Sequence, residues 1–336
     1  MSEKASILLV GAGGVGTIAA LNLDKGGLAE VTAVLRSNYD KVSKEGFHIK
    51  SVDHGELQGW RPSKVVKQIP NHAEKQFDFI VVTTKNIPDH HPTTAELIEP
   101  AVTPGKTIIV LIQNGLNIEK PIFAKFPNNI CLSGISMIGS HETSPAFIEH
   151  EDPDELILGA FENPNIPKET LQEAARKFVN IYAAGGKTVC TYTDDVPFHR
   201  WRKLVYNACI NTLGAITGLD SGRIRLANDT VETLLRPAMD EIVAAAKACG
   251  ISLPSDVVDF MINVDPLTTY LKPSMLVDVL KGNLTEFENL LGEPLREGTS
   301  RGVPMPTATF IYHTLKAIQW KFKEGKGYIT IPPKSV

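Results

Sequence analysis

Three polar side chains interrupt the largely apolar stretch WRKLVYNACINTLGA, residues 201–215. Lys203, Asn207 and Asn211 follow one another at four-residue intervals, and this spacing places them on one face of a helix. One interpretation is a solvent-facing stripe, although Asn in a helix interior costs about 0.6 kcal/mol relative to Ala and exposed stripes are usually filled by Glu, Lys, Gln or Arg. The other is a ligand cleft, in which the lysine gives up a proton and the two amides orient a polar ligand.

A glycine-rich turn follows the first apolar run of the chain. The sequence GAGGVG, residues 11–16, comes after ASILLV and before an alanine-rich helical pattern, which is the strand, GxGxxG, helix order of a dinucleotide site. The glycines permit a tight turn, leave room for a pyrophosphate and allow close helix packing, while the helix N-terminus faces the phosphates. The alternative is a tight turn without a ligand. The residues predicted to bind the cofactor here are Gly11, Gly13, Gly14, Val15 and Gly16.

The end of the second apolar run indicates which dinucleotide is bound. An NAD-binding protein would carry Asp or Glu about 20 residues after the glycines to bind the ribose 2′-hydroxyl. The sequence VLRSNYDK instead places Arg36 there, followed by Ser37 and Asn38. A guanidinium with small hydroxyl and amide donors beside it suits a 2′-phosphate, and the alternative is a surface arginine at the start of a loop. We therefore predict NADPH/NADP as the cofactor, with Arg36 in contact with it.

Two further polar residues stand at the ends of apolar runs. Lys85 ends FIVVTTK and Asn114 follows IIVLIQ, and ligands of open α/β sheets collect beyond the carboxyl ends of the strands. Lys85 could instead be solvated, and the Asn-Gly pair could be an ordinary turn. Together with the 201–215 stripe, the two residues form a set of donors with no evident structural role.

These residues must be positioned by two kinds of structure. A chain of 336 residues with 43% hydrophobic residues is long enough for two domains. Up to about residue 190 short apolar runs alternate with helical patterns, and after Thr193 only helical periodicity continues. We predict an α/β N-terminal Rossmann-type doubly wound sheet in residues 1–193 and an all-α C-terminal domain in residues 194–336. The predicted strands are 5–10, 30–36, 77–84, 106–113, 129–139, 155–161 and 187–193, and the predicted helices before the boundary are 15–25, 93–101 and 168–183.

Composition excludes several other classes of protein. The net charge is -4 and the basic residues are dispersed, which argues against nucleic acid or an anionic membrane as partner. The N-terminus has the pattern of a first strand, with no signal peptide, and no window is apolar enough for a membrane span, so a cytoplasmic location is expected. The four cysteines share no metal-ligand spacing, and His90 and His91 have no third ligand in view, so no metal is expected.

Several polar residues have a structural explanation that competes with a functional one. Thr285 and Glu288 have the spacing of a capping box, which assigns Glu288 to helix initiation, and Glu286, one residue into that helix, could complement its dipole. Ser274 would be a good N-cap. The acidic segment 149–155 is expected to be a solvated loop; at the mouth of a cleft it would instead disfavour a small anionic keto acid.

The order of the motifs is more specific than any one of them. The motifs are GAGGVG, Arg36, TTK, QNG, WRKLVYNACIN, PSMLVD, TEFENLLG and GVPMPT. In order and approximate spacing they resemble the ketopantoate reductase family, the 2-dehydropantoate 2-reductases, over essentially the whole chain. The lysine and two asparagines, with the later Ser-Met and Thr-Glu pairs, carry this resemblance further than the glycine loop does.

The resemblance implies catalytic roles for Lys203 and Glu286. Lys203 matches the catalytic acid of the family, and Glu286 matches a glutamate of its active-site network. Hydride transfer from nicotinamide to a ketone carbon leaves negative charge on the oxygen, which an ammonium can both stabilise and protonate. Partial burial beside Trp201 is expected to lower the pKa of Lys203 from its usual value of about 10.4. Glu286 could counter that shift or relay protons.

The resemblance also implies binding roles on a cleft between the two domains. The substrate-binding positions are Asn207, Asn211, Ser274 and Asn114, and the nicotinamide end of the cleft is lined by Lys85 and Asn114.

The expected function is NADPH-dependent reduction of 2-dehydropantoate to pantoate, a step of pantothenate biosynthesis. The alternatives are reduction of a different 2-keto acid, carbonyl or imine on the same scaffold, and a non-catalytic NADP-binding sensor. A homodimer is compatible with the sequence, because an apolar helical surface packs equally well internally or against a second copy.

Overall fold

The structure, a computed structural model, describes residues 4–333, which form two compact units. Unit 1 comprises the chain up to Asn86 together with His90–Gln113 and Ile118–Val196. Unit 2 comprises the chain from Pro197 onward together with two short segments, Ile87–Asp89 and Asn114–Asn117. Unit 2 is therefore discontinuous in sequence. The expected division into residues 1–193 and 194–336 assigns these two short segments to the N-terminal domain instead.

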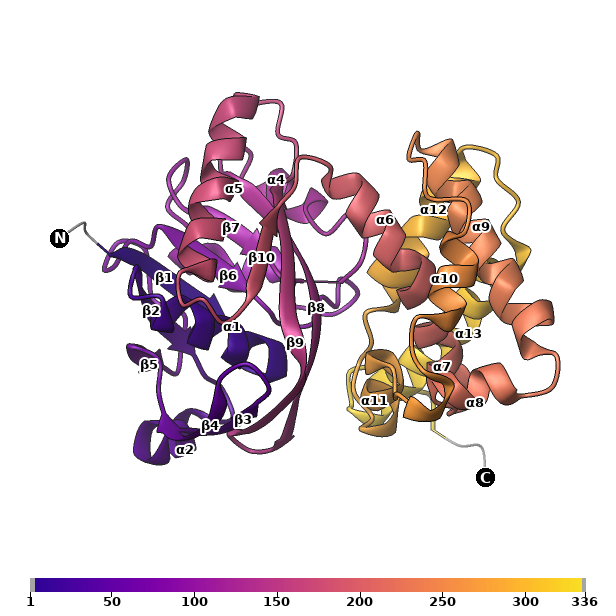
Figure 1. The fold of residues 1–336 in the computed structure, drawn as a ribbon, viewed down its shortest axis with the longest axis horizontal. Helices are drawn as coiled ribbons and strands as arrows, with labels where there is room; N and C mark the ends of the chain where they lie inside the picture. Colours follow the sequence, from indigo (N-terminus) through magenta and orange to yellow (C-terminus); the bar gives the residue numbers. More distant parts are fainter. Residues whose placement is uncertain (1–3, 334–336) are drawn as a thin grey trace. The chain divides into compact units, whose positions relative to one another are not determined.

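Unit 1 is built on one mixed sheet, which has ten strands in the described part of the chain (Figure 1). Its strands are β1 (Ala5–Val10), β2 (Ala29–Val34), β3 (Phe47–Ser51), β4 (Gly55–Trp60), β5 (Lys64–Val66), β6 (Phe79–Val82), β7 (Ile108–Leu111), β8 (Cys131–Ser144), β9 (Phe147–Ala160) and β10 (Val189–Tyr192). The spatial order is β4-β3-β9-β8-β7-β6-β1-β2-β5, with β10 beside β9. Apart from the β3–β4 hairpin, the strands β5-β2-β1-β6-β7-β8 run parallel in the 3-2-1-4-5-6 order of a Rossmann sheet.

Helices cover both faces of this sheet. They are α1 (Gly14–Lys25), α2 (Tyr39–Glu45), α3 (Thr94–Ile98), α4 (Lys120–Lys125), α5 (Lys168–Ala183) and the 3-10 turn η1 (Glu99–Ala101). On one face α1 and α5 pack over the sheet, with Ile18 and Phe178 fully buried. On the other face Ile98 and Ile122 of α3 and α4 are fully buried. Burial on both faces explains why the central strands are continuously apolar, and it confirms the predicted doubly wound fold.

The long hairpin β8–β9 corrects the prediction for the acidic segment. Residues 149–155 do not form a loop; they lie within β9, which pairs antiparallel with β8 and parallel with β3. Asp154 is buried and accepts hydrogen bonds from Asn22 (2.8 Å), Tyr182 (2.8 Å) and Thr188 (2.9 Å). These bonds offset part of the cost of burying the carboxyl, and desolvation raises its pKa. The prediction of a solvated loop at residues 149–155 is therefore wrong.

The secondary-structure elements of unit 2, within its described residues, are all helices, joined by loops (Figure 1). Its elements are α6 (Val196–Asn207), α7 (Ile210–Thr217), α8 (Ser221–Leu226), η2 (Val231–Leu235), α9 (Arg236–Ala248), α10 (Val257–Asn263), η3 (Leu267–Thr269), α11 (Ser274–Leu280), η4 (Glu288–Gly292), α12 (Glu293–Ser300) and α13 (Pro306–Gly325). They enclose a separate apolar core that includes Val205, Met239, Ile242, Leu291 and Ile311. Within residues 4–333 the search for a helix long and apolar enough to cross a membrane gave none.

The stretch 201–215 is not one helix. It breaks after Asn207, so Lys203 and Asn207 lie on α6 while Asn211 lies on α7. The hydroxyl of Thr212 donates to the carbonyl oxygens of Ala208 (2.6 Å) and Cys209 (2.9 Å). Such side-chain bonds compete with the helical hydrogen bonds and bend the chain. The four-residue spacing therefore placed the first two residues on one helix but could not place the third.

Candidate active site

The glycine turn lies between β1 and α1 in unit 1. Gly11 has a φ of +102°, which only glycine adopts without strain. A Cβ on Gly16 would overlap the carbonyl oxygen of Gly11, so this glycine permits the close approach of helix and strand. Gly13 has no protein atom within 4 Å of where its Cβ would be, so its outer side is open. The geometry is that of a turn with an accessible face at the N-terminus of α1, where phosphate oxygens are favoured.

The other predicted cofactor residues of unit 1 lie just beyond the carboxyl ends of strands. Arg36 is exposed two residues after β2, and Lys85 is exposed three residues after β6. Asn38, predicted to help Arg36, is buried, and its side-chain amide donates to Glu142. Glu142 also accepts a hydrogen bond from the backbone N–H of Ala146 (3.0 Å). Asn38 therefore has a structural role in unit 1.

In unit 2 the predicted catalytic lysine meets a predicted asparagine from a distant part of the chain. Lys203 Nζ donates to Asn114 Oδ1 at 2.7 Å. Lys203 is partly exposed, and Asn114 belongs to the short segment that packs in unit 2. The amide oxygen gives the ammonium a fixed direction, as a proton donor requires.

The surroundings of Lys203 make it a better acid. Desolvation is the main cause that lowers the pKa of Lys203 to about 8, and the nearby positive charge of Arg200 lowers it further. The carboxyl group of Glu286 opposes both effects electrostatically and raises the pKa. At neutral pH the ammonium form still predominates, and it gives up its proton more readily than an ordinary lysine.

Asn211 and Ser274 form a second group in unit 2. Asn211 Nδ2 lies 3.4 Å from Ser274 Oγ, and Asn211 is buried. Ser274 is not the N-cap of α11; it is the first residue of that helix, and Pro273 precedes it as the cap. Asn207, one turn after Lys203 on α6, is also buried.

The capping box predicted at Thr285 and Glu288 is wrong. The backbone N–H of Thr285 donates to Gln319 (2.9 Å), while Glu288 pairs with Arg296 (2.9 Å). Glu288 begins the π-helical turn η4, so Glu286 precedes that turn and is not one residue into a helix. Long-range partners thus replaced the local ones that the spacing suggested.

Two further buried polar residues of unit 2 were not predicted from the sequence. Arg200 is buried and donates to the carbonyl oxygen of Gly115 (2.8 Å). Asn289 is buried and donates to the carbonyl oxygen of Leu116 (2.9 Å). Arg200 could have been found, because it lies three residues before Lys203 and directly before the predicted helical stretch 201–215. Asn289 gave no signal, since its partner is distant in sequence.

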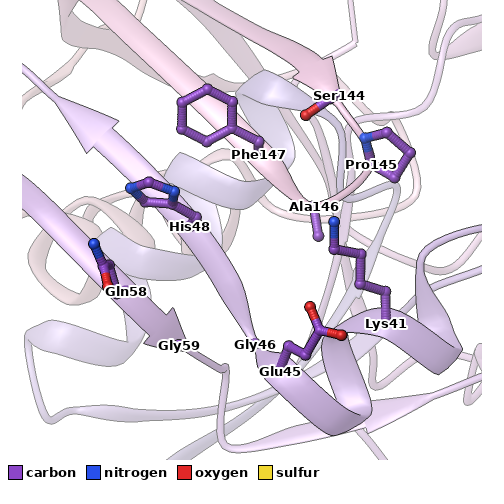
Figure 2. A pocket seen from close by; sticks show the side chains of 10 residues that line it. All are labelled: Lys41, Glu45, Gly46, His48, Gln58, Gly59, Ser144, Pro145, Ala146 and Phe147. Atoms are coloured by element: carbon purple, nitrogen blue, oxygen red, sulfur yellow. The ribbon is translucent and has the colours of Figure 1, made fainter.

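A surface pocket in unit 1 involves other residues (Figure 2). Its lining residues are Lys41, Glu45, Gly46, His48, Gln58, Gly59, Ser144, Pro145, Ala146 and Phe147. His48 packs against the ring of Phe147 at 4.7 Å and pairs with Glu56 at 2.7 Å. None of the predicted site residues lines this pocket. Within residues 4–333 there is no group of three or more His, Cys, Asp or Glu side chains suited to a metal.

Sheet order and glycine turn together put the chain in the class of Rossmann-type proteins, whose glycine turn binds dinucleotides. Residues 7–163 match the family model described as Ketopantoate reductase PanE/ApbA, and residues 195–319 match its C-terminal counterpart. The chain therefore belongs to the ketopantoate reductase family.

Individual relatives match over nearly the whole chain. An uncharacterised protein of Saccharomyces cerevisiae is 37% identical, with 98% of each chain covered. The crystal structure of 2-dehydropantoate 2-reductase from Methylococcus capsulatus is 30% identical with a TM-score of 0.78, covering 94% of this chain and 97% of that one. A D-mandelate dehydrogenase, solved with NADH and anilino(oxo)acetate, shares the fold at 20% identity and a TM-score of 0.80, covering 95% and 99% of the two chains.

Proposed function

We propose that this protein reduces 2-dehydropantoate to pantoate with NADPH, as a step of pantothenate biosynthesis in the cytoplasm. The observation that carries the proposal is the Lys203 ammonium, held by Asn114 at 2.7 Å and given a lowered pKa by its surroundings. A sensor that only binds the cofactor would have no need for such a proton donor. Membership of the ketopantoate reductase family supports the choice of a 2-keto acid as substrate.

The residues of the chain divide the work of the reaction. Bound at the glycine turn, a reduced nicotinamide dinucleotide would supply hydride to the keto carbon. Lys203 stabilises the negative charge that develops on the keto oxygen and donates the proton from Nζ to it. Asn114 orients Nζ for that donation. Asn207, Asn211 and Ser274 bind and orient the substrate, and Glu286 keeps part of the positive charge on Lys203.

The direct test is the loss of NADPH absorbance with purified protein and a panel of 2-keto acids. The panel contains 2-dehydropantoate, pyruvate, 2-ketoisovalerate and benzoylformate, the last because a D-mandelate dehydrogenase shares the fold. Turnover of 2-dehydropantoate with the highest kcat/KM supports the proposal. Turnover of another member alone keeps the chemistry and changes the substrate. NADPH binding without turnover of any member contradicts the proposed function and favours the sensor.

The pH dependence of kcat/KM is expected to report the state of Lys203. Reduction needs the protonated amine, and the pKa of Lys203 is about 8, so activity should be level below pH 8 and fall about tenfold per pH unit above it. Replacing Glu286 by Gln removes a negative charge that raises this pKa, so the alkaline limb should move to lower pH. Full pH profiles of both proteins check this. An unmoved limb with a uniformly lower rate would give Glu286 a role other than electrostatic support of Lys203.

Replacing Arg36 by Ala is expected to weaken NADPH binding selectively. Loss of a charged hydrogen bond to the 2′-phosphate costs about 1.5–3 kcal/mol, which corresponds to a rise of about 10- to 100-fold in Kd for NADPH. The Kd for NADH should hardly change, because NADH has no 2′-phosphate. Fluorescence titration of both cofactors measures the two values, with Lys106→Ala, exposed before the start of β7, as control. Equal losses for both cofactors would argue against a contact between Arg36 and the 2′-phosphate.

A further inference from the structure

The segment that carries Asn114 is fixed to unit 2 by several hydrogen bonds. Arg200 Nη1 donates to the carbonyl oxygen of Gly115 at 2.8 Å. Asn117 Nδ2 donates to the carboxylates of Glu293 (2.5 Å) and Glu297 (2.8 Å). These contacts hold the residues that follow Asn114, so they limit where its side chain can lie.

Asn289 makes the most complete of these attachments. Its backbone oxygen accepts from the N–H of Leu116 at 2.9 Å, and its side-chain Nδ2 donates to the oxygen of the same residue at 2.9 Å. Both backbone groups of Leu116 are thus paired with one residue, in the manner of a strand partner. Because Asn289 is buried, losing this donor would leave a polar carbonyl without its buried partner.

The fit is close enough to exclude any side chain on Gly115. A Cβ there would lie 2.6 Å from the Cβ of Asn289 and 2.8 Å from its carbonyl oxygen. Gly115 also has a φ of +105°, where other residues are strained. The backbone before Leu116 therefore runs directly against Asn289.

The same turn of chain also holds the backbone of Glu286, whose carboxyl group acts on Lys203. Asn289 lies in the π-helical turn η4, three residues after Glu286, and the backbone N–H of Leu290 donates to the backbone carbonyl oxygen of Glu286 at 3.0 Å. π-helical turns are rare and recur at functional sites. One short stretch is thus bonded to the backbone of Glu286 and to the backbone of Leu116, two residues after Asn114.

We propose that Asn289 is a positioning residue of the active site, which holds Asn114 against Lys203 through the backbone of Gly115 and Leu116. This proposal rests on the proposed function for its effect on turnover. It adds a residue that acts on Lys203 through another side chain. Misplacing a catalytic group by about 1 Å can cost up to about 100-fold in rate.

The test is a double-mutant cycle of Asn289→Leu and Asn114→Ala. If Asn289 acts through Asn114, each single variant lowers kcat by about tenfold or more, and the double variant is no slower than Asn114→Ala. Any change in KM for NADPH that Asn114→Ala causes should be the same in the double variant. Losses that multiply, or an unchanged kcat in a folded Asn289→Leu protein, overturn the proposal. The control is Asn263→Ala, which removes a comparable bond of 2.9 Å from Asn Nδ2 to a backbone oxygen on α10 and should leave kcat unchanged.

A second readout does not depend on turnover. The rate at which an amine-specific acylating reagent modifies Lys203, followed by peptide mass spectrometry, should rise by the same factor in Asn114→Ala and in the double variant. It should rise in Asn289→Leu but not in Asn263→Ala. If wild-type protein reduces no keto acid, this arm still decides whether Asn289 holds Asn114 against Lys203. Should Asn289→Leu fail to fold, Gly115→Ala disturbs the same contact from the other side and enters the same cycle.

Discussion

Replacing Lys203 by Ala is expected to lower kcat/KM for keto-acid reduction by about 1,000-fold. General acids contribute about 100- to 10,000-fold, and Lys203 both donates the proton and stabilises charge on the oxygen. The loss should be in kcat, because the ammonium interacts most strongly with the charge that develops during hydride transfer. Steady-state kinetics with the best substrate of the panel measures it.

A second substitution distinguishes proton donation by Lys203 from the effect of its positive charge. Lys203→Arg keeps a positive charge but cannot release a proton at accessible pH, so it should bind substrate while remaining at least about 100-fold slower than wild type. Lys247→Ala, which changes an exposed lysine on α9, is the control and should have wild-type rates. Wild-type kcat in Lys203→Arg would contradict the role of Lys203 as proton donor and leave it only an electrostatic one.

Two glycines of the same turn are expected to respond to alanine in opposite ways. In Gly16→Ala the new methyl group would overlap the oxygen of Gly11 and crowd the hydroxyl of Thr83, so strand and helix must separate. Overpacking of this kind costs about 3 kcal/mol or more in the free energy of unfolding. In Gly13→Ala the methyl group meets no protein atom, and the φ of -80° suits alanine, so stability should change by less than about 1 kcal/mol.

The Gly13→Ala substitution is instead expected to weaken the binding of NADPH. If the pyrophosphate lies against the open side of Gly13, the methyl group displaces it, and the Kd for NADPH should rise by about 100-fold in Gly13→Ala. Urea unfolding gives the stability of both variants, and fluorescence titration gives the NADPH affinity of Gly13→Ala. Wild-type affinity in that variant would place the pyrophosphate elsewhere.

The sequence predicted the fold well where the signal was continuous along the chain. The strand β1 and the helix α5 were predicted with the bounds that the structure has, because one is apolar at every residue except Ser6 and the other repeats apolar residues along one face. The strands β3, β4 and β5 were missed. The second of them, GELQGW, is exposed or half-buried throughout and lies at the edge of the sheet, so it has no apolar run to detect.

Local spacing was less reliable at the site. It brought Lys203 and Asn207 onto one helix, and it singled out Asn114 at the end of a strand, where the side-chain oxygen accepts a hydrogen bond from Lys203. It failed at Thr285, whose backbone N–H finds Gln319 on α13, and at Asn289, whose partner is far away in the sequence. Such pairings depend on the packing of the finished unit, which no window of the sequence contains.

The short segments Ile87–Asp89 and Asn114–Asn117 affect how the protein can be recombined with its relatives. Asp89 is paired with Lys323 at 2.6 Å, and Leu116 with Asn289, so both segments are attached to residues near the C-terminal end of the sequence. A chimera that joins residues 197–336 to the first part of another family member would take Lys203 from one parent and the counterpart of Asn114 from the other. The helical unit is therefore inherited intact only if the exchanged module also includes these two loops, and designed crossovers should be placed to keep them with it.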